Sequence, residues 1–171
     1  RLPETKGPVL DIRFIGDELV VGIGSNAGVP GTLWVWRVDK TEWKLHAIDV
    51  KPLTGLTGIT RAAFSADNRF MAAAYDDGRI AGVEFTIHPE HRRRAIRMIG
   101  FVERKLLPVE SLSVLPSDNL VIAVSRGASV EIWNLHTSSL MARIQESEPV
   151  RRFVFAKDGE SVATATQTRV G

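Results

Sequence analysis

Short apolar segments alternate with polar turns along the whole chain of 171 residues. The stretch from Phe64 to Phe85 shows the pattern best, because it reads as three short strands separated by two tight turns. Alternating apolar positions bounded by Gly, Asp and Asn are typical of β-strands, and no segment has a convincing helical spacing. We therefore predict an all-β fold. The predicted strands are residues 9–14, 18–24, 32–38, 44–50, 59–65, 69–75, 79–87, 95–103, 109–115, 120–125, 129–135, 140–145, 150–156 and 161–167.

The turns also repeat at long range. A polar turn that carries an aspartate follows the first strand of four successive units, and these aspartates lie 50, 51 and 40 residues apart. Such a period accommodates four strands per unit. The turns are Gly16-Asp17-Glu18, Ala66-Asp67-Asn68, Ser117-Asp118-Asn119 and Lys157-Asp158-Gly159. A single four-stranded sheet with apolar residues on both faces cannot bury them alone, so we expect the units to stack.

Segments of these units resemble the repeat of the WD-repeat β-propeller family. The matching segments are Phe64–Arg69, Tyr75–Arg79, Val130–Asn134 and Phe155–Gly159. The resemblance implies a β-propeller segment with four-stranded antiparallel blades at about residues 8–51, 58–104, 108–146 and 149–171, the last of them incomplete. It identifies as structural turn and blade residues Asp67, Asp77, Asp118, Asp158, Trp36 and Trp133.

In this family a hydrogen-bonded network of His, Ser or Thr, Asp and Trp holds each blade together. Asp77 matches this set in the second unit, and Ser125 and Trp133 match it in the third. No unit carries the full set, since neither Trp36 nor Trp133 is followed by Asp and the family's Gly-His dipeptide is missing. Blade stability is therefore expected to rest mainly on apolar packing between sheets, with Trp34 and Trp36 in that core.

The number of blades bears on how the protein works. Propellers usually close with about 4 to 8 blades, so about three and a half are too few to close. Two explanations remain open. The chain belongs to a longer protein or assembly that supplies the missing blades, which we favour, or two copies join half-propellers into a ring of about seven blades. An exposed half-blade edge would invite pairing with another chain.

The charge balance directs attention to one local cluster. There are 22 Lys and Arg against 20 Asp and Glu, a formal charge of +2, so the total implies no general affinity for nucleic acid or acidic membranes. The densest cluster lies in the loop of residues 91–97. One interpretation is a solvated loop. The other is a contact surface for an acidic protein, a phosphate or RNA, formed by Arg92, Arg93, Arg94 and Arg97.

No reaction class emerges from the remaining motifs. Gly22–Ala27 matches the G-x-G-x-x-A variant of a dinucleotide fingerprint, but glycines and Pro30 follow where a helix is needed, so we expect an enlarged loop between two strands. His88 and His91 fit a solvated loop better than a metal site, which needs three or four converging ligands. The chain has no G-x-S-x-G turn and no cysteine. We expect no enzyme activity, no cofactor and no metal.

The sequence therefore predicts a non-catalytic, WD-repeat-like scaffold for protein–protein interaction within a larger protein or complex. The alternative is a nucleic-acid or phosphate-binding component that uses the basic loop 91–97, and a weaker alternative is an enzyme with a nucleotide site at residues 22–27. Expected partners are other subunits or further blades of the same protein; a half-propeller homodimer stays open. Since no long apolar run or signal-peptide h-region is visible, we expect an intracellular, cytoplasmic location without membrane insertion.

Overall fold

The computed structural model of the protein describes residues 9–15, 19–26, 29–39, 41, 44–48, 58–87, 94–102, 107–115 and 118–166. In these ranges the chain is all-β, as predicted, and its sheets are antiparallel. None of the described residues form a helix that is long and apolar enough to cross a membrane. The chain divides into two compact units, residues 1–60 and 61–171, and each is described by itself.

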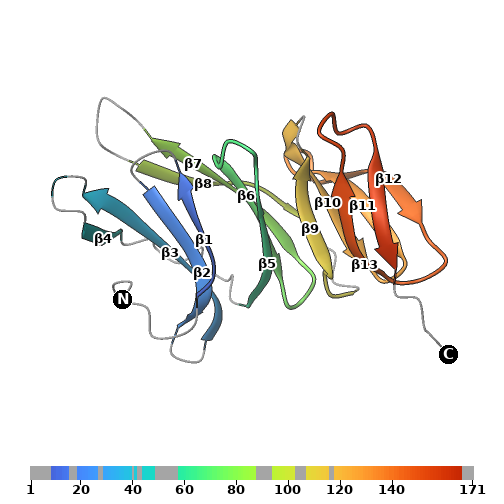
Figure 1. The fold of residues 1–171 in the computed structure, drawn as a ribbon, viewed down its shortest axis with the longest axis horizontal. Helices are drawn as coiled ribbons and strands as arrows, with labels where there is room; N and C mark the ends of the chain where they lie inside the picture. The colour runs from blue at the N-terminus through green and yellow to red at the C-terminus, as the bar shows by residue number, and fades with distance from the viewer. Residues whose placement is uncertain are drawn as a thin grey trace. The chain divides into compact units, whose positions relative to one another are not determined.

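The first unit contains one four-stranded sheet in which neighbours in sequence are neighbours in the sheet (Figure 1). This first sheet consists of β1 (Val9–Ile15), β2 (Leu19–Asn26), β3 (Val29–Asp39) and β4 (Lys44–Ile48).

The second unit contains three sheets with the same simple up-and-down order, and each begins where the previous one ends. The second sheet consists of β5 (Ile59–Phe64), which starts just before the unit boundary, β6 (Phe70–Tyr75), β7 (Ile80–Ile87) and β8 (Arg94–Val102). The third sheet consists of β9 (Ser111–Leu115), β10 (Asp118–Arg126), β11 (Ser129–Asn134) and β12 (Ser139–Gln145). The fourth sheet has two strands, β13 (Val150–Phe155) and β14 (Val162–Thr166).

One local prediction is wrong. Residues 19–24 form β2 as predicted, but residues 25 and 26, expected in an enlarged loop, continue this strand; within it Gly22 pairs with Trp34 across the ladder to β3. The rings of Trp34 and Trp36 stack with their centroids 6.1 Å apart. A Cβ atom on Gly22 would lie 2.7 Å from Cζ3 of Trp36, so glycine makes room for the indole. Val20, Trp34 and Trp36 form the buried cluster of this sheet.

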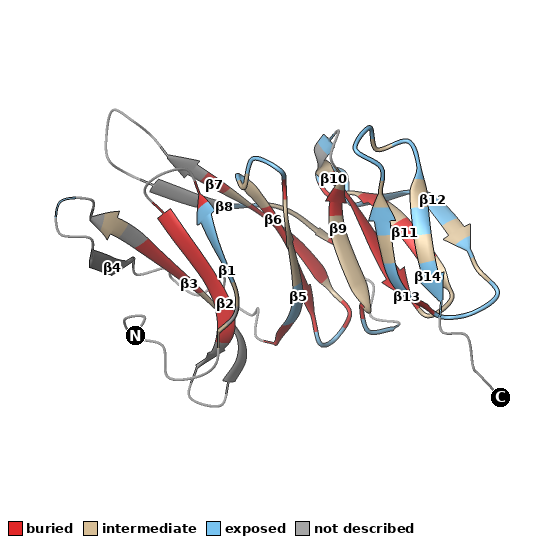
Figure 2. Ribbon diagram, in the orientation of Figure 1, coloured by how far each residue is buried: buried red, intermediate tan, exposed pale blue. Residues whose placement is uncertain are grey.

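The main core of the second unit lies between the second and third sheets. Strands at the centre of both sheets are buried, whereas the outer strand β12 is largely exposed (Figure 2). Small residues come from one sheet and larger ones from the other, so the faces approach closely and interdigitate. The buried members are Ala72, Ala74, Ile80 and Val102 of the second sheet and Val109, Val114, Ile122, Val124, Trp133 and Leu135 of the third.

A pair of glycines fixes how these two sheets meet. Gly82 and Gly100 are direct partners in the β7–β8 ladder and leave a flat area without side chains. Leu135, just after β11, fills it: a Cβ atom on Gly100 would lie 1.7 Å from the Leu135 carbonyl oxygen, and one on Gly82 would lie 2.8 Å from its Cδ1. Ser138 in the same turn donates a hydrogen bond to the carbonyl oxygen of Phe101 at 2.8 Å. The β11–β12 turn is therefore seated on β7 and β8.

Candidate interaction surfaces and the buried polar network

The four aspartates identified through the family resemblance share one geometry; Asp118 is the first residue of β10 and the other three lie in turns, whereas Asp17 of the first repeat turn lies outside the described residues. In each case Oδ1 accepts a hydrogen bond from the backbone N–H two residues later, which is the Asx-turn arrangement. The pairs are Asp67 with Arg69 (3.0 Å), Asp77 with Arg79 (3.0 Å), Asp118 with Leu120 (2.8 Å) and Asp158 with Glu160 (2.9 Å). These carboxylates fix the backbone of separate turns, and no two of them converge on a common site.

The Asp67 turn is the most elaborate of the four. Ser65 Oγ donates to Asp67 Oδ1 at 2.6 Å and accepts from the N–H of Phe70 at 3.0 Å. Partial burial raises the pKa of Asp67, but the hydrogen bonds from Ser65 and from the N–H of Arg69, together with the charge of Arg69, outweigh it and hold the pKa below its usual value. Asp67 is therefore ionised in the folded protein at neutral pH.

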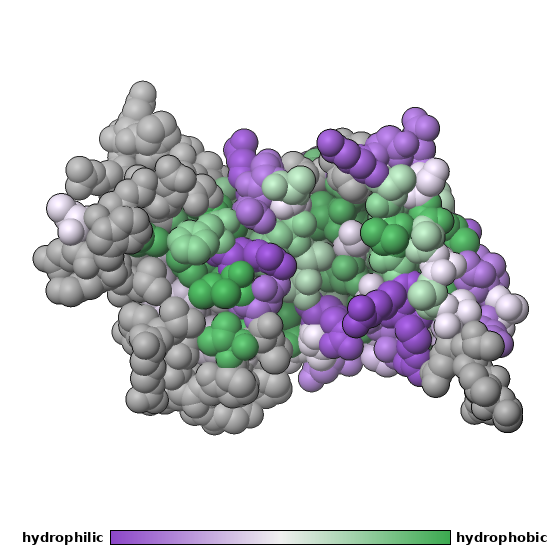
Figure 3. All heavy atoms as spheres, viewed as in Figure 1, coloured by the Kyte–Doolittle hydropathy of each residue, from purple (hydrophilic) through white to green (hydrophobic). Residues whose placement is uncertain are grey.

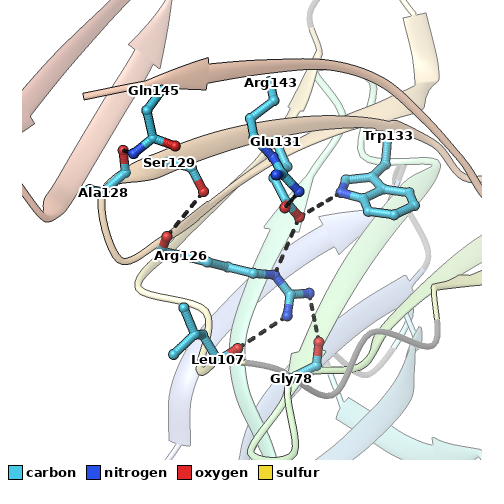
Figure 4. A network of polar contacts seen from close by, with 9 residues as sticks. All are labelled: Gly78, Leu107, Arg126, Ala128, Ser129, Glu131, Trp133, Arg143 and Gln145. Atoms are coloured by element: carbon cyan, nitrogen blue, oxygen red, sulfur yellow. Dashed lines mark hydrogen bonds and ion pairs between the residues drawn. The ribbon is translucent and has the colours of Figure 1, made fainter. Parts of the chain in front are cut away.

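A buried ionic network in the third sheet is the most unusual feature of the second unit (Figure 4). Arg126 is the last residue of β10 and Glu131 lies on β11 opposite Val124; each is only 4% exposed. Arg126 donates from Nη2 to the carbonyl oxygen of Gly78 at 2.6 Å and from Nη1 to that of Leu107 at 3.1 Å. Because Gly78 lies in the β6–β7 turn, this arginine ties the third sheet to the second.

Glu131 contacts three other side chains of the network. Its Oε2 lies 3.8 Å from Nε of Arg126 and accepts a hydrogen bond from Nε1 of Trp133 at 3.1 Å. Its Oε1 accepts from Nη2 of Arg143 on β12 at 2.6 Å. A buried carboxylate is costly unless paired and hydrogen-bonded, and here three donor-bearing side chains surround it.

This network differs from the one that the family resemblance implies for a blade. Trp133, which is 8% exposed, donates to Glu131 two residues earlier on the same strand face. The Ser125 hydroxyl is buried and has no hydrogen-bond partner among the described residues. Arg126 and Glu131 were not singled out from the sequence. The available signal was Glu131 at the position two before Trp133, which places a carboxylate on a face expected to be buried.

The basic cluster of residues 91–97 is only partly within the described chain. Arg92 and Arg93 lie outside it, and Arg94 is placed as a strand residue of β8 that pairs with Ile87. Arg97 contacts its cross-strand neighbour: Nη2 lies 2.6 Å and Nε 3.0 Å from Oε2 of Glu84. One of the four candidate arginines is thus engaged in an intramolecular ion pair, which reduces the positive field at that place.

A second set of charges links the first strands of the three sheets of the second unit. Arg61 on β5 donates from Nε to the carbonyl oxygen of Glu110 at 3.2 Å. Arg151 on β13 pairs with the Glu110 carboxylate at 3.2 Å. Both arginines therefore converge on one residue before β9. The Arg151–Glu110 ion pair is partly exposed and contributes at most about 1 kcal/mol.

Exposed apolar side chains mark candidate contact surfaces in both units. In the first sheet, Ile12 and Phe14 of β1 are 43% and 62% exposed and share the face that carries Trp34 and Trp36. In the second unit, Figure 3 shows apolar atoms beside polar patches on the face in view. The most exposed large apolar residue there is Val154 of β13, at 64%.

No group of three or more metal-ligating side chains occurs within the described residues. His88 and His91 lie outside them. In comparisons with known proteins, no family model and no curated protein matched the chain.

Proposed function

We propose that this chain is a segment of a WD-repeat-like β-propeller and acts as a non-catalytic scaffold for protein–protein interaction within a larger protein or complex. The observation that carries the proposal is the stacking in the second unit, where two consecutive four-stranded sheets of one topology meet face to face through an apolar core and the two-stranded fourth sheet packs on the third through another. Radial repetition of such sheets is how propellers protect their strand edges.

Incomplete coverage at two sheets supports the interaction role. The face of the first sheet that holds Trp34 and Trp36 leaves Phe14 62% exposed. The fourth sheet has two strands and leaves Val154 64% exposed. Exposed apolar surface of this kind is typical of contact sites. Further blades of a longer protein, or other subunits, would cover it.

The test combines affinity capture with native mass measurement. The purified chain should form a stoichiometric complex with a partner protein that survives raised salt, because apolar contacts are not screened. Recovery of no partner even at low salt would count against the scaffold role. A compact monomer of the isolated chain in solution scattering would refute the closure of a ring by a second copy or by other subunits.

A further inference from the structure

The first strands of the three sheets in the second unit carry an excess of positive charge. Strands β5, β9 and β13 together contain three arginines and no acidic residue. Arg61 lies on β5, and Arg151 and Arg152 lie on β13. Glu110 lies directly before β9. We name Arg61, Glu110 and Arg151 the first-strand row.

The two arginines of the row reach Glu110 from different sheets. Arg61 lies two residues before Ala63, which packs in the core between the second and third sheets, so both side chains face the third sheet. Nε of Arg61 donates to the carbonyl oxygen of Glu110 at 3.2 Å. Arg151 lies two residues before Phe153, which packs on the third sheet, and its Nη1 lies 3.2 Å from Oε2 of Glu110. The row therefore brings two guanidinium groups beside one residue.

The excess charge of the row is accessible to solvent. Arg61 is exposed, and the side chains of Arg151 and Glu110 are 51% and 33% exposed. One carboxylate balances one guanidinium, so the three residues keep a net positive charge. Each guanidinium also has five N–H donors arranged in a plane, of which the contacts above use one apiece. The row can therefore attract an anion without giving up its contacts to Glu110.

The side chains of the row fit carboxylates better than nucleic acid. The planar guanidinium matches a carboxylate, and its contact with Glu110 holds each long side chain in place, which lowers the entropy lost on binding. Single-stranded nucleic acid is bound by exposed aromatic side chains in addition to positive charge. The aromatic residues of these strands, Phe64, Phe153 and Phe155, are all partly buried.

We propose that the first-strand row is a contact site for an acidic segment of a partner protein, whose carboxylates pair with Arg61 and Arg151. This inference rests on the proposed interaction function and names the chemistry of the partner. The carboxylate of Glu110 is an internal competitor, because it already pairs with Arg151. Ion pairs at an exposed site are individually weak, so the row contributes to partner choice and association rate more than to total affinity.

A labelled hexaglutamate peptide is the probe, and its binding to the purified chain is measured by fluorescence anisotropy at low ionic strength. Arg61→Gln and Arg151→Gln should each weaken binding about three- to fivefold, and the double variant about tenfold or more. Arg152→Gln is the matched control. It removes the same charge from the next residue, which alternates to the other face of β13, and it should change binding by less than about twofold. Equal losses in all three single variants would mean general charge attraction and would overturn the site.

Replacement of Glu110 tests the same site in the opposite direction. Glu110→Gln removes the competing carboxylate and should strengthen binding of hexaglutamate about threefold. A variant that fails to fold cannot produce such a gain. Glu160→Gln changes the net charge equally in the turn between β13 and β14, at the end of this hairpin far from Arg151, and should leave binding unchanged. Weaker binding by Glu110→Gln would contradict the proposal.

Three outcomes separate this inference from its alternatives. If oligothymidylate binds more tightly than hexaglutamate and depends on Arg61 and Arg151 in the same way, the ligand is a phosphate chain and the assigned partner class is wrong. If a captured partner protein binds the double arginine variant as well as the unchanged chain, the row is wrong and the scaffold role stands. If hexaglutamate binds at the row but no partner protein is captured, the scaffold role fails and the affinity of the row for carboxylates stands.

Discussion

Replacement of Glu131 by Leu tests whether the buried network holds the second and third sheets together. The substitution removes the acceptor of the indole N–H of Trp133, a residue that is only 8% exposed. An unsatisfied buried donor costs about 1–3 kcal/mol. Arg126 keeps its bonds to two carbonyl oxygens but loses the Glu131 carboxylate, which lies 3.8 Å from its Nε. Breaking a buried pair in this way costs about 3–5 kcal/mol in total.

Urea unfolding followed by circular dichroism measures this cost, and hydrogen exchange of the Trp133 indole N–H reports on the lost bond. With a denaturant slope of about 2 kcal/mol per M, the midpoint should fall by about 1.5–2.5 M. Arg143→Ala is the matched control. Its side chain is 41% exposed, so its loss should cost at most about 1 kcal/mol although it contacts the same carboxylate.

A double-mutant cycle completes the argument. Replacing Arg126 by Met and Glu131 by Leu together removes both charges, and a buried ion pair exchanged for apolar residues of similar size is often close to neutral. The double variant should therefore be more stable than the sum of the single effects predicts, by about 1–3 kcal/mol. Additive single effects, or equal losses for Glu131→Leu and Arg143→Ala, would refute the view that these groups act as one buried network.

Three further predictions follow from the second unit. Gly100→Ala should destabilise the fold far more than Gly82→Ala in thermal melting, because the new Cβ atom meets the Leu135 carbonyl oxygen at 1.7 Å in the first case and a movable methyl group at 2.8 Å in the second. Burial raises the pKa of Tyr75 to about 12, so in an absorbance titration the only tyrosine of the chain should stay protonated above pH 10, and the stability that its neutral form provides should be lost between about pH 10 and 12. The lowered pKa of Asp67 gives stability that is present above its unfolded value and lost as the pH falls below about 4, so Asp67→Asn should flatten the acid limb of a stability–pH curve.

The strands were predictable because the local signals agree with one another. Aspartate turns, apolar alternation and the absence of helical spacing all indicate the same elements, and the observed strand limits differ from the predicted ones by at most three residues. The largest departures are at β2 and β3. There residues 25–31 were interpreted as an enlarged loop because of their glycines and Pro30, whereas residues 25–26 continue β2 and residues 29–31 begin β3. Asn26 pairs with Val29, so the β2–β3 ladder extends further than the local turn signal indicates.

The contacts between sheets were not predictable in the same way. Gly82 and Gly100 are ordinary residues until the β7–β8 register makes them partners, and Leu135 lies 35 residues beyond the second of them. Arg126 and Glu131 belong to the charged residues that usually face solvent. Arg126 can be buried because the carbonyl oxygens of Gly78 and Leu107, which lie far from it in the sequence, accept its hydrogen bonds. Sequence periodicity gives the face of a residue on its own strand, but it does not say what covers that face.

Two apolar positions on outer strands show how burial depends on the neighbouring sheet. Val102 and Ile144 occupy equivalent places on the outer strands of two successive sheets, and both face the next sheet. Their residue types are alike, so the difference in burial cannot come from side-chain chemistry. It follows from the covering sheet, which has four strands over Val102 and two over Ile144. The same position of the repeat is therefore fully buried under a four-stranded neighbour and only partly buried under a two-stranded one.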